Sequence, residues 1–202
     1  MRRWTDSTFV FVSANAEHEP RGVEERWIPV MQALTEKGAT VRFLALPQSP
    51  MGEWARGLGI AVDPYILDKW NVVRSRSRLR KYLKRFDPVA AHSTGLEADL
   101  VLRWAARKVP RVEVVHTICC GAPQTTRRRR PIDALMRRFD ELGMRSVATV
   151  FVDDEEIARE VSEARVPGER VVLDPPGADR RASVRAHLEV YRRLMASKGA
   201  AG

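Results

Sequence analysis

The side chains best suited to chemistry follow two short apolar segments in the middle of the sequence. His92 and Ser93 come directly after the first segment, and His116 and Cys119 lie at the end of the second. Imidazole nitrogens and hydroxyl groups hydrogen-bond to sugar hydroxyls or phosphates, and a thiolate can act as a nucleophile. These four residues are therefore our candidate ligand contacts.

Each candidate also has a structural interpretation. A histidine at the end of a buried strand can bond a neighbouring backbone group instead of a ligand. Cys119 would need an activating base and a lowered pKa to act as a nucleophile, and the sequence shows neither, so a small buried thiol is the simpler interpretation. Cys119 and Cys120 are adjacent and have no C-x-x-C spacing. We therefore predict no metal and no cofactor.

Residues 89–123 predict a strand–helix–strand unit that positions these candidates. The apolar runs 89–91 and 112–118 flank an amphipathic helix that opens after the small-residue turn 93–95. No hairpin turn separates the runs, which predicts a parallel pair joined by a right-handed crossover. Both strands then end at the same edge of the sheet, where open α/β folds bind their ligands.

Apolar runs alternate with amphipathic segments in the rest of the chain. We predict further strands at 9–13, 41–46, 60–67, 147–152 and 170–173, and helices at 23–37, 50–58, 71–86, 131–145, 155–164 and 182–197. This alternation is typical of an α/β fold with a doubly wound, mainly parallel, Rossmann-like sheet. We expect one domain over residues 1–180, followed by residues 181–202 as a helix that packs back on it and ends in a frayed tail.

Length and composition indicate a globular domain without a membrane span. The chain has 202 residues, of which 44% are hydrophobic and 30% charged. No stretch approaches the roughly 18 consecutive apolar residues that a spanning helix needs. The N-terminus predicts a first strand rather than a signal peptide. Cysteine usage fits a reducing compartment, so we expect a cytoplasmic location.

The charge favours anionic partners, because the chain carries a net charge of +9. Basic residues gather on one face of the helix expected at 71–86 and in a loop near residue 127; the candidates are Arg74, Arg78, Lys81, Arg85, Arg127 and Arg128. Peripheral docking on the anionic inner face of a membrane is one interpretation, since each such charge contributes about 1 kcal/mol. A solvated basic surface is the other. Nucleic acid is less favoured, because no exposed aromatic residues are interleaved.

Several segments together resemble the N-terminal, acceptor-side domain of a GT-B glycosyltransferase of retaining family 4. FVSANAEHEPRGVEERWIPVMQAL resembles that family's first strand, glycine loop and first helix, and VAAHSTGLEADLVLRWAARK resembles its D-V-V-H-x-H/S strand and the following helix. VEVVHTICCGAP resembles the strand that ends in T-x-H, and VATVFVDDEEIAREVSEARVPGERVVLDPPGAD resembles the last strands before the linker. RASVRAHLEVYRRLMA resembles the helix that returns from the second domain in complete enzymes.

The resemblance implies a nucleotide-sugar donor and a sugar or lipid acceptor, and it implies that the acceptor-binding residues are His92, Ser93, His116 and Cys119. It implies that Arg21, Gly22 and Glu24 form the loop beside the donor phosphates, although Gly22 could equally be an ordinary turn glycine. Arg21 stands where a loop glycine is common, and Cys119 stands where the histidine of T-x-H is usual. These departures leave the acceptor undefined.

The resemblance gives no counterpart to the second, donor-binding domain. We therefore expect sugar transfer only with a separately supplied donor domain, such as a partner chain, and we assign no catalytic residue. The alternative is a non-catalytic binding or regulatory module, a degenerate glycosyltransferase that docks on an anionic membrane or on a partner enzyme.

Overall fold

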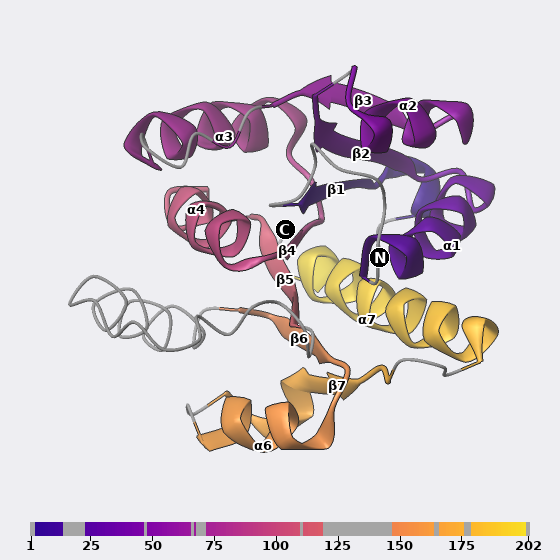
Figure 1. Cartoon of the computed structure of the whole chain (residues 1–202), viewed down its shortest axis with the longest axis vertical. Coiled ribbons are helices and arrows are strands. Elements are labelled where there is room, and N and C mark those ends of the chain that lie inside the picture. Colours follow the sequence, from indigo (N-terminus) through magenta and orange to yellow (C-terminus); the bar gives the residue numbers. More distant parts are fainter. Residues whose placement is uncertain are drawn as a thin grey trace.

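Seven parallel strands form one sheet in the described part of the chain (Figure 1). The computed structural model describes residues 3–13, 23–46, 48–65, 67, 72–109, 111–118, 147–163, 166–175 and 179–200. The strands are β1 Thr8–Ser13, β2 Thr40–Ala45, β3 Ala61–Pro64, β4 Ala90–Thr94, β5 Glu113–Ile118, β6 Thr149–Val152 and β7 Val171–Leu173. The helices are α1 Val23–Glu36, α2 Pro50–Gly57, α3 Val72–Phe86, α4 Leu96–Ala106, α6 Glu155–Glu163 and α7 Arg180–Ala200, with single 3-10 turns at Trp4–Asp6 and Gly168–Arg170.

The strand order is β3-β2-β1-β4-β5-β6-β7, and every neighbouring pair is parallel. The chain winds outward from β1 to β3, then returns to the other side of β1 and winds the opposite way from β4. This confirms the predicted doubly wound, Rossmann-like α/β fold. It also places the reversal of strand order between β1 and β4.

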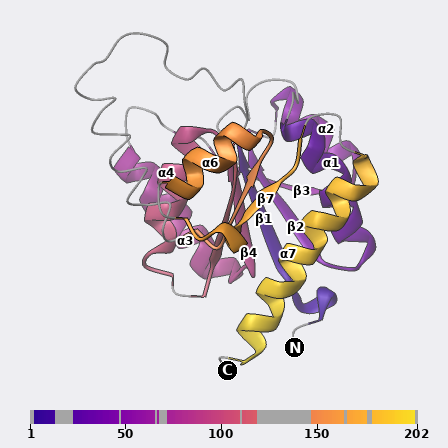
Figure 2. The same cartoon turned by 90° about the horizontal axis from the view of Figure 1, so that it is seen from below.

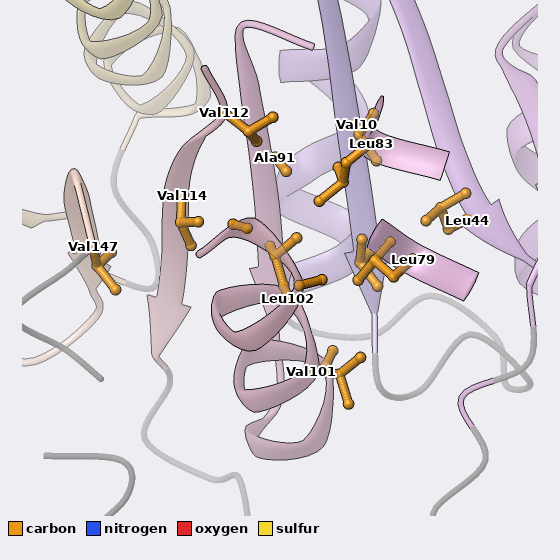
Figure 3. Close-up of a cluster of buried hydrophobic side chains, with 14 of the residues drawn as sticks. Val10, Leu44, Leu79, Leu83, Ala91, Val101, Leu102, Val112, Val114 and Val147 are labelled. Atoms are coloured by element: carbon orange, nitrogen blue, oxygen red, sulfur yellow. The ribbon is translucent and has the colours of Figure 1, made fainter. Parts of the chain in front are cut away.

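Alternating side chains divide the core into two layers. In β1, Phe9 and Phe11 belong to the cluster packed against α1, α2 and α7, whereas Val10 and Val12 belong to the cluster packed against α3, α4 and α6. Figures 1 and 2 show these helices on opposite faces of the sheet, and Figure 3 shows part of the second cluster, including Leu79 and Leu83 of α3. Both faces are buried, as expected of a parallel sheet covered by helices.

The C-terminal helix α7 lies beside α1 (Figure 2). Its residues Val190, Tyr191 and Met195 are buried in the cluster that contains Phe9 and Trp27. Asp179 caps the helix, because its carboxylate accepts a hydrogen bond from the Arg181 backbone N–H at 3.1 Å. The helix is therefore longer than the predicted 182–197.

Two predicted strand boundaries are wrong. The strand predicted to end at His92 continues to Thr94, so that His92 lies inside β4. The strand predicted over 60–67 is shorter and ends at Pro64, which has no N–H to donate to a ladder. The helix predicted at 131–145 lies outside the described residues, as do Arg127 and Arg128.

Candidate functional site

The candidate site is the carboxyl edge of the sheet at the reversal between β1 and β4. Ser13, the last residue of β1, is level with Thr94, the last residue of β4. Gly95 follows β4 with φ +84° and begins the connection into α4, a conformation that favours glycine. β1 and β4 therefore end side by side at the reversal of strand order, where open α/β folds have their ligand crevice, and the N–H groups that open α4 face this edge of the fold.

The predicted donor loop belongs to this crevice by its place in the chain. Arg21 and Gly22 lie in the β1–α1 connection, which is outside the described residues, as is Cys119 after β5. Glu24 is the second residue of α1, and its side chain is likewise not among those described. The roles expected for these four residues therefore stay predictions.

His92 lies in the core rather than at the edge, because it is inside β4 and faces α7. It is 1% exposed, its Nδ1 is 2.6 Å from the Tyr191 hydroxyl, and its Nε2 is 2.6 Å from Thr117 Oγ1. Burial, with smaller contributions from the neighbouring histidines, lowers the pKa of His92 well below its ordinary value. Both ring nitrogens have protein partners, so the structure favours the structural interpretation of this histidine.

Ser93 and His116 point to the other face of the sheet, where they meet a buried ion pair. Asp99 and Arg103 of α4 are 0% and 3% exposed, and Arg103 Nη2 lies 2.6 Å from Asp99 Oδ2. Ser93 donates to Asp99 Oδ1 at 3.1 Å, and His116 Nδ1 lies 3.2 Å from the same oxygen and 3.2 Å from the Ser93 carbonyl oxygen. Two of the predicted contacts, Ser93 and His116, are thus brought together.

Asp99 and Arg103 are not among the residues predicted from the sequence. The available signal was their i, i+4 spacing on the helix face that also carries Ala98 and Leu102. A carboxylate placed beside Nδ1 fixes the orientation of an imidazole ring and directs its Nε2 outward. The group can therefore hold His116 in one orientation near the end of β5.

A groove of about 460 Å³ opens farther along this edge, between α1, α7 and the segment after β7. Arg26 of α1 lines it and donates to the Asp174 carbonyl oxygen at 2.5 Å and to Asp153 Oδ2 at 3.5 Å. Ser183 of α7 donates to Asp174 Oδ2 at 3.0 Å. These residues were also missed, although Asp153 and Asp174 directly follow predicted strands and so must reach the same edge.

The basic face predicted on the helix at 71–86 is present on α3. Arg74, Arg78, Lys81 and Arg85 are all exposed. Beside them, Val73 is 62% exposed and Trp104 of α4 is 38% exposed, and the Arg76 guanidinium lies 4.4 Å from the centre of the Trp104 ring. No helix in the described ranges has the length and apolarity to span a bilayer.

Comparison with known proteins assigns the fold. A family model for the glycosyl transferase 4-like domain matches residues 21–177. Similar solved structures include Anabaena Alr3699/HepE in complex with UDP, with a TM-score of 0.64, 11% identity and coverage of 85% of this chain and 44% of that one. A glycosyltransferase from Rickettsia africae ESF-5 has a TM-score of 0.64 and 12% identity, with 86% and 44% covered. No curated protein matches the sequence.

An enzyme of another class has the same fold. UDP-GlcNAc 2-epimerase from Neisseria meningitidis, solved with UDP-GlcNAc bound, has a TM-score of 0.60 and 15% identity, with 91% of this chain and 48% of that one covered. At such identities the likeness extends to the fold alone. This chain spans less than half the length of each of these proteins.

Proposed function

The chain belongs to the glycosyl transferase 4-like domain family, and from that premise we propose that it forms the acceptor-side half of a sugar-transfer site. A second, donor-binding domain completes the site by closing over the carboxyl edge of the sheet. The donor is a nucleotide-sugar, and the acceptor is a sugar or a lipid. The chain alone transfers little or no sugar.

The observation that carries this proposal is the family match over residues 21–177, which begins after β1 and includes α1, β4 and β5. The proteins of the same fold support the donor class, because their structures hold UDP, UDP-glucose or UDP-GlcNAc.

The proposed site has a donor side and an acceptor side. On the donor side, the backbone N–H groups around Gly22 approach the diphosphate at the start of α1, and Arg21 adds a guanidinium that can bond phosphate oxygens in pairs. On the acceptor side, His116, held by Asp99, and Cys119 after β5 contact the acceptor. His92 does not contact the acceptor; it is buried in the core and helps to position β5 through its hydrogen bond with Thr117. Rate enhancement then comes from positioning the two substrates and from stabilising charge on the leaving phosphate.

The test measures UDP release from UDP-glucose and UDP-GlcNAc in the presence of a panel of sugar and lipid acceptors, which receive the glycosyl group. We expect no release by the chain alone, and release when a donor-binding domain from a complete family member is added. Gly22→Ala should lower this release about tenfold, because an added methyl group displaces the diphosphate from the backbone. Gly57→Ala is the matched control, since a Cβ at Gly57 meets nothing within 4 Å.

Two results contradict the proposal. Release at full rate by the pure chain refutes the need for a second domain. If no donor-binding domain leads to UDP release from either nucleotide-sugar, the transferase role is refuted and the non-catalytic alternative is favoured.

The second candidate function is docking on an anionic membrane through α3. The observation that favours it is the exposed basic face of α3 next to the exposed side chains of Val73 and Trp104. Basic residues attract anionic headgroups, and an exposed tryptophan suits the headgroup level of a bilayer. This function is compatible with a catalytic or a non-catalytic chain.

Vesicle co-sedimentation tests this candidate. We expect binding to vesicles that contain phosphatidylserine and no binding to pure phosphatidylcholine. Replacing both Arg78 and Lys81 with glutamine should weaken binding about tenfold or more, because each charge contributes about 1 kcal/mol. The control replaces Arg192 and Arg193, two exposed arginines of α7, with glutamine. Equal losses in the two double variants would mean that net charge alone governs binding, which refutes a docking face.

A further inference from the structure

The helix α7 presents two buried histidine contacts to the sheet. His187, which is 1% exposed, stacks on Phe151 of β6 with ring centroids 3.7 Å apart and planes 2° from parallel. One turn later, the hydroxyl of Tyr191 lies 2.6 Å from Nδ1 of His92 in β4. Both imidazoles therefore lie in the interface between α7 and the sheet.

The hydrogen bonds of His187 suit an uncharged ring. Its Nδ1 lies 3.0 Å from the Ser183 carbonyl oxygen, so that Nδ1–H donates and Nε2 carries the lone pair. In the described part of the chain, the buried Nε2 has no hydrogen-bond partner. Protonation would place an N–H at this position with no acceptor to receive it, which is costly in a buried site.

The hydrogen bonds of His92 likewise suit an uncharged ring. A neutral imidazole donates from one nitrogen and accepts at the other, which matches two hydroxyl partners, Tyr191 and Thr117. A protonated ring donates from both nitrogens, so the hydroxyl that had donated to it must direct its proton elsewhere. The rings of Phe11 and Trp27 surround the site, at 5.6 and 4.9 Å between centroids, and accept such a proton poorly.

The charged groups around the two histidines do not compensate fully for burial. Asp174, after β7, favours a charged His187, whereas Arg26 of α1 opposes it, and Asp153 is paired with that arginine. His187 of α7 and His116 of β5 both oppose charge on His92. Burial is the largest influence on both, and the pKa of each is lowered from its ordinary value of 6.5.

From this geometry we propose that α7 is an acid-releasable strap, which stays docked on the sheet while His92 and His187 are uncharged and is released when they gain protons. β1 and β4 are held by ladders on both sides, whereas α7 is held by side-chain packing against α1 and the sheet. Undocking of α7 is therefore the smallest opening that removes His187 from the core and frees the Nδ1 of His92.

The direction of the pH dependence follows from linkage. Because both histidines bind protons more weakly when docked, docking is at full strength above pH 6.5 and weakens as pH falls below it. Each pH unit below that value weakens docking by up to about tenfold per histidine. Ser183 and Arg180 of α7 line the 460 Å³ groove, so release also removes one wall of this groove.

Hydrogen exchange of the full chain tests the proposal. After correction for the intrinsic pH dependence of exchange, the opening constant of α7 amides should rise up to about 100-fold between about pH 7.5 and pH 5.5, while amides of β1 and β4 keep their protection. His187→Phe keeps the stacking on Phe151 and cannot gain a proton, so its rise should be only about tenfold. His92→Gln, which keeps a donor and an acceptor, should show a similarly reduced rise.

His116→Gln is the matched control, because His116 is buried on the opposite face of the sheet, away from α7. It should keep a rise clearly larger than tenfold, because His116 makes only a lesser contribution to the cost of charge on His92. The proposal is overturned if α7 protection does not change with pH, if the strands lose protection together with α7, or if both His187→Phe and His92→Gln respond like the unmodified chain. If His187→Phe fails to fold, His92→Gln alone decides between these outcomes.

Discussion

At the scale of single residues, backbone conformation decides whether replacing an exposed glycine with alanine stabilises or destabilises the fold. Gly38 has φ +80°, and a Cβ there would lie 3.0 Å from Thr5 Cγ2, whereas Gly57 is helical with open space around it. We expect Gly38→Ala to lower the free energy of unfolding by about 1–2 kcal/mol, since other residues pay for a left-handed conformation. Gly57→Ala should raise it by about 0.5 kcal/mol, because alanine favours a helix. Urea denaturation of both variants checks this, and equal effects would contradict it.

At the scale of elements, an ion pair between β2 and β3 is linked to α3 by a tyrosine hydroxyl. Arg42 of β2 contacts both carboxylate oxygens of Asp63 in β3, at 2.7 and 2.8 Å, and the Tyr82 hydroxyl of α3 donates to Asp63 at 2.5 Å. Burial alone would raise the pKa of Asp63, but the hydrogen bonds from Arg42 and Tyr82 and the Arg42 charge outweigh it and leave this pKa lowered. The charged form of Asp63 therefore stabilises the edge strand β3.

The sign of this effect gives a pH prediction. Stability from a lowered carboxyl pKa is present above the unfolded value of 3.8 and is lost as pH falls through the lowered folded value. We expect Asp63→Asn to cost about 1 kcal/mol near pH 7 and progressively less below about pH 4. Urea denaturation at several pH values measures the difference. A cost that persists unchanged in acid would mean that Asp63 acts through shape and not through charge.

At the scale of the whole molecule, α7 covers one side of the core. Val190, Tyr191 and Met195 are buried against Phe9 and Trp27. Burying such side chains stabilises by about 1.5–3 kcal/mol each, and a domain has about 5–15 kcal/mol in total. We expect a chain that ends at residue 178 to melt cooperatively at a clearly lower temperature and to bind a hydrophobic dye at its uncovered core. Circular dichroism melting checks this, and a melt within a few degrees of the full chain would refute it.

The sequence alone determined the order of elements, the parallel sheet and the family resemblance. These follow from local information, because hydrophobic periodicity and short motifs such as the glycine turns are properties of neighbouring residues. The same sequence patterns also predicted that ligands bind at the carboxyl edge of the sheet, because parallel strands joined by helices all end on one side.

Only the tertiary structure decided what individual polar side chains do. His92 and His116 both belong to short strands of similar composition, yet one faces Tyr191 of α7 and the other faces Asp99 of α4. The face that a strand residue occupies depends on register, and its partner depends on which helix crosses there, both of which are set by packing between distant segments. For the same reason Arg26, Asp153 and Asp174, far apart in the sequence, meet only when α1, β6 and β7 come together.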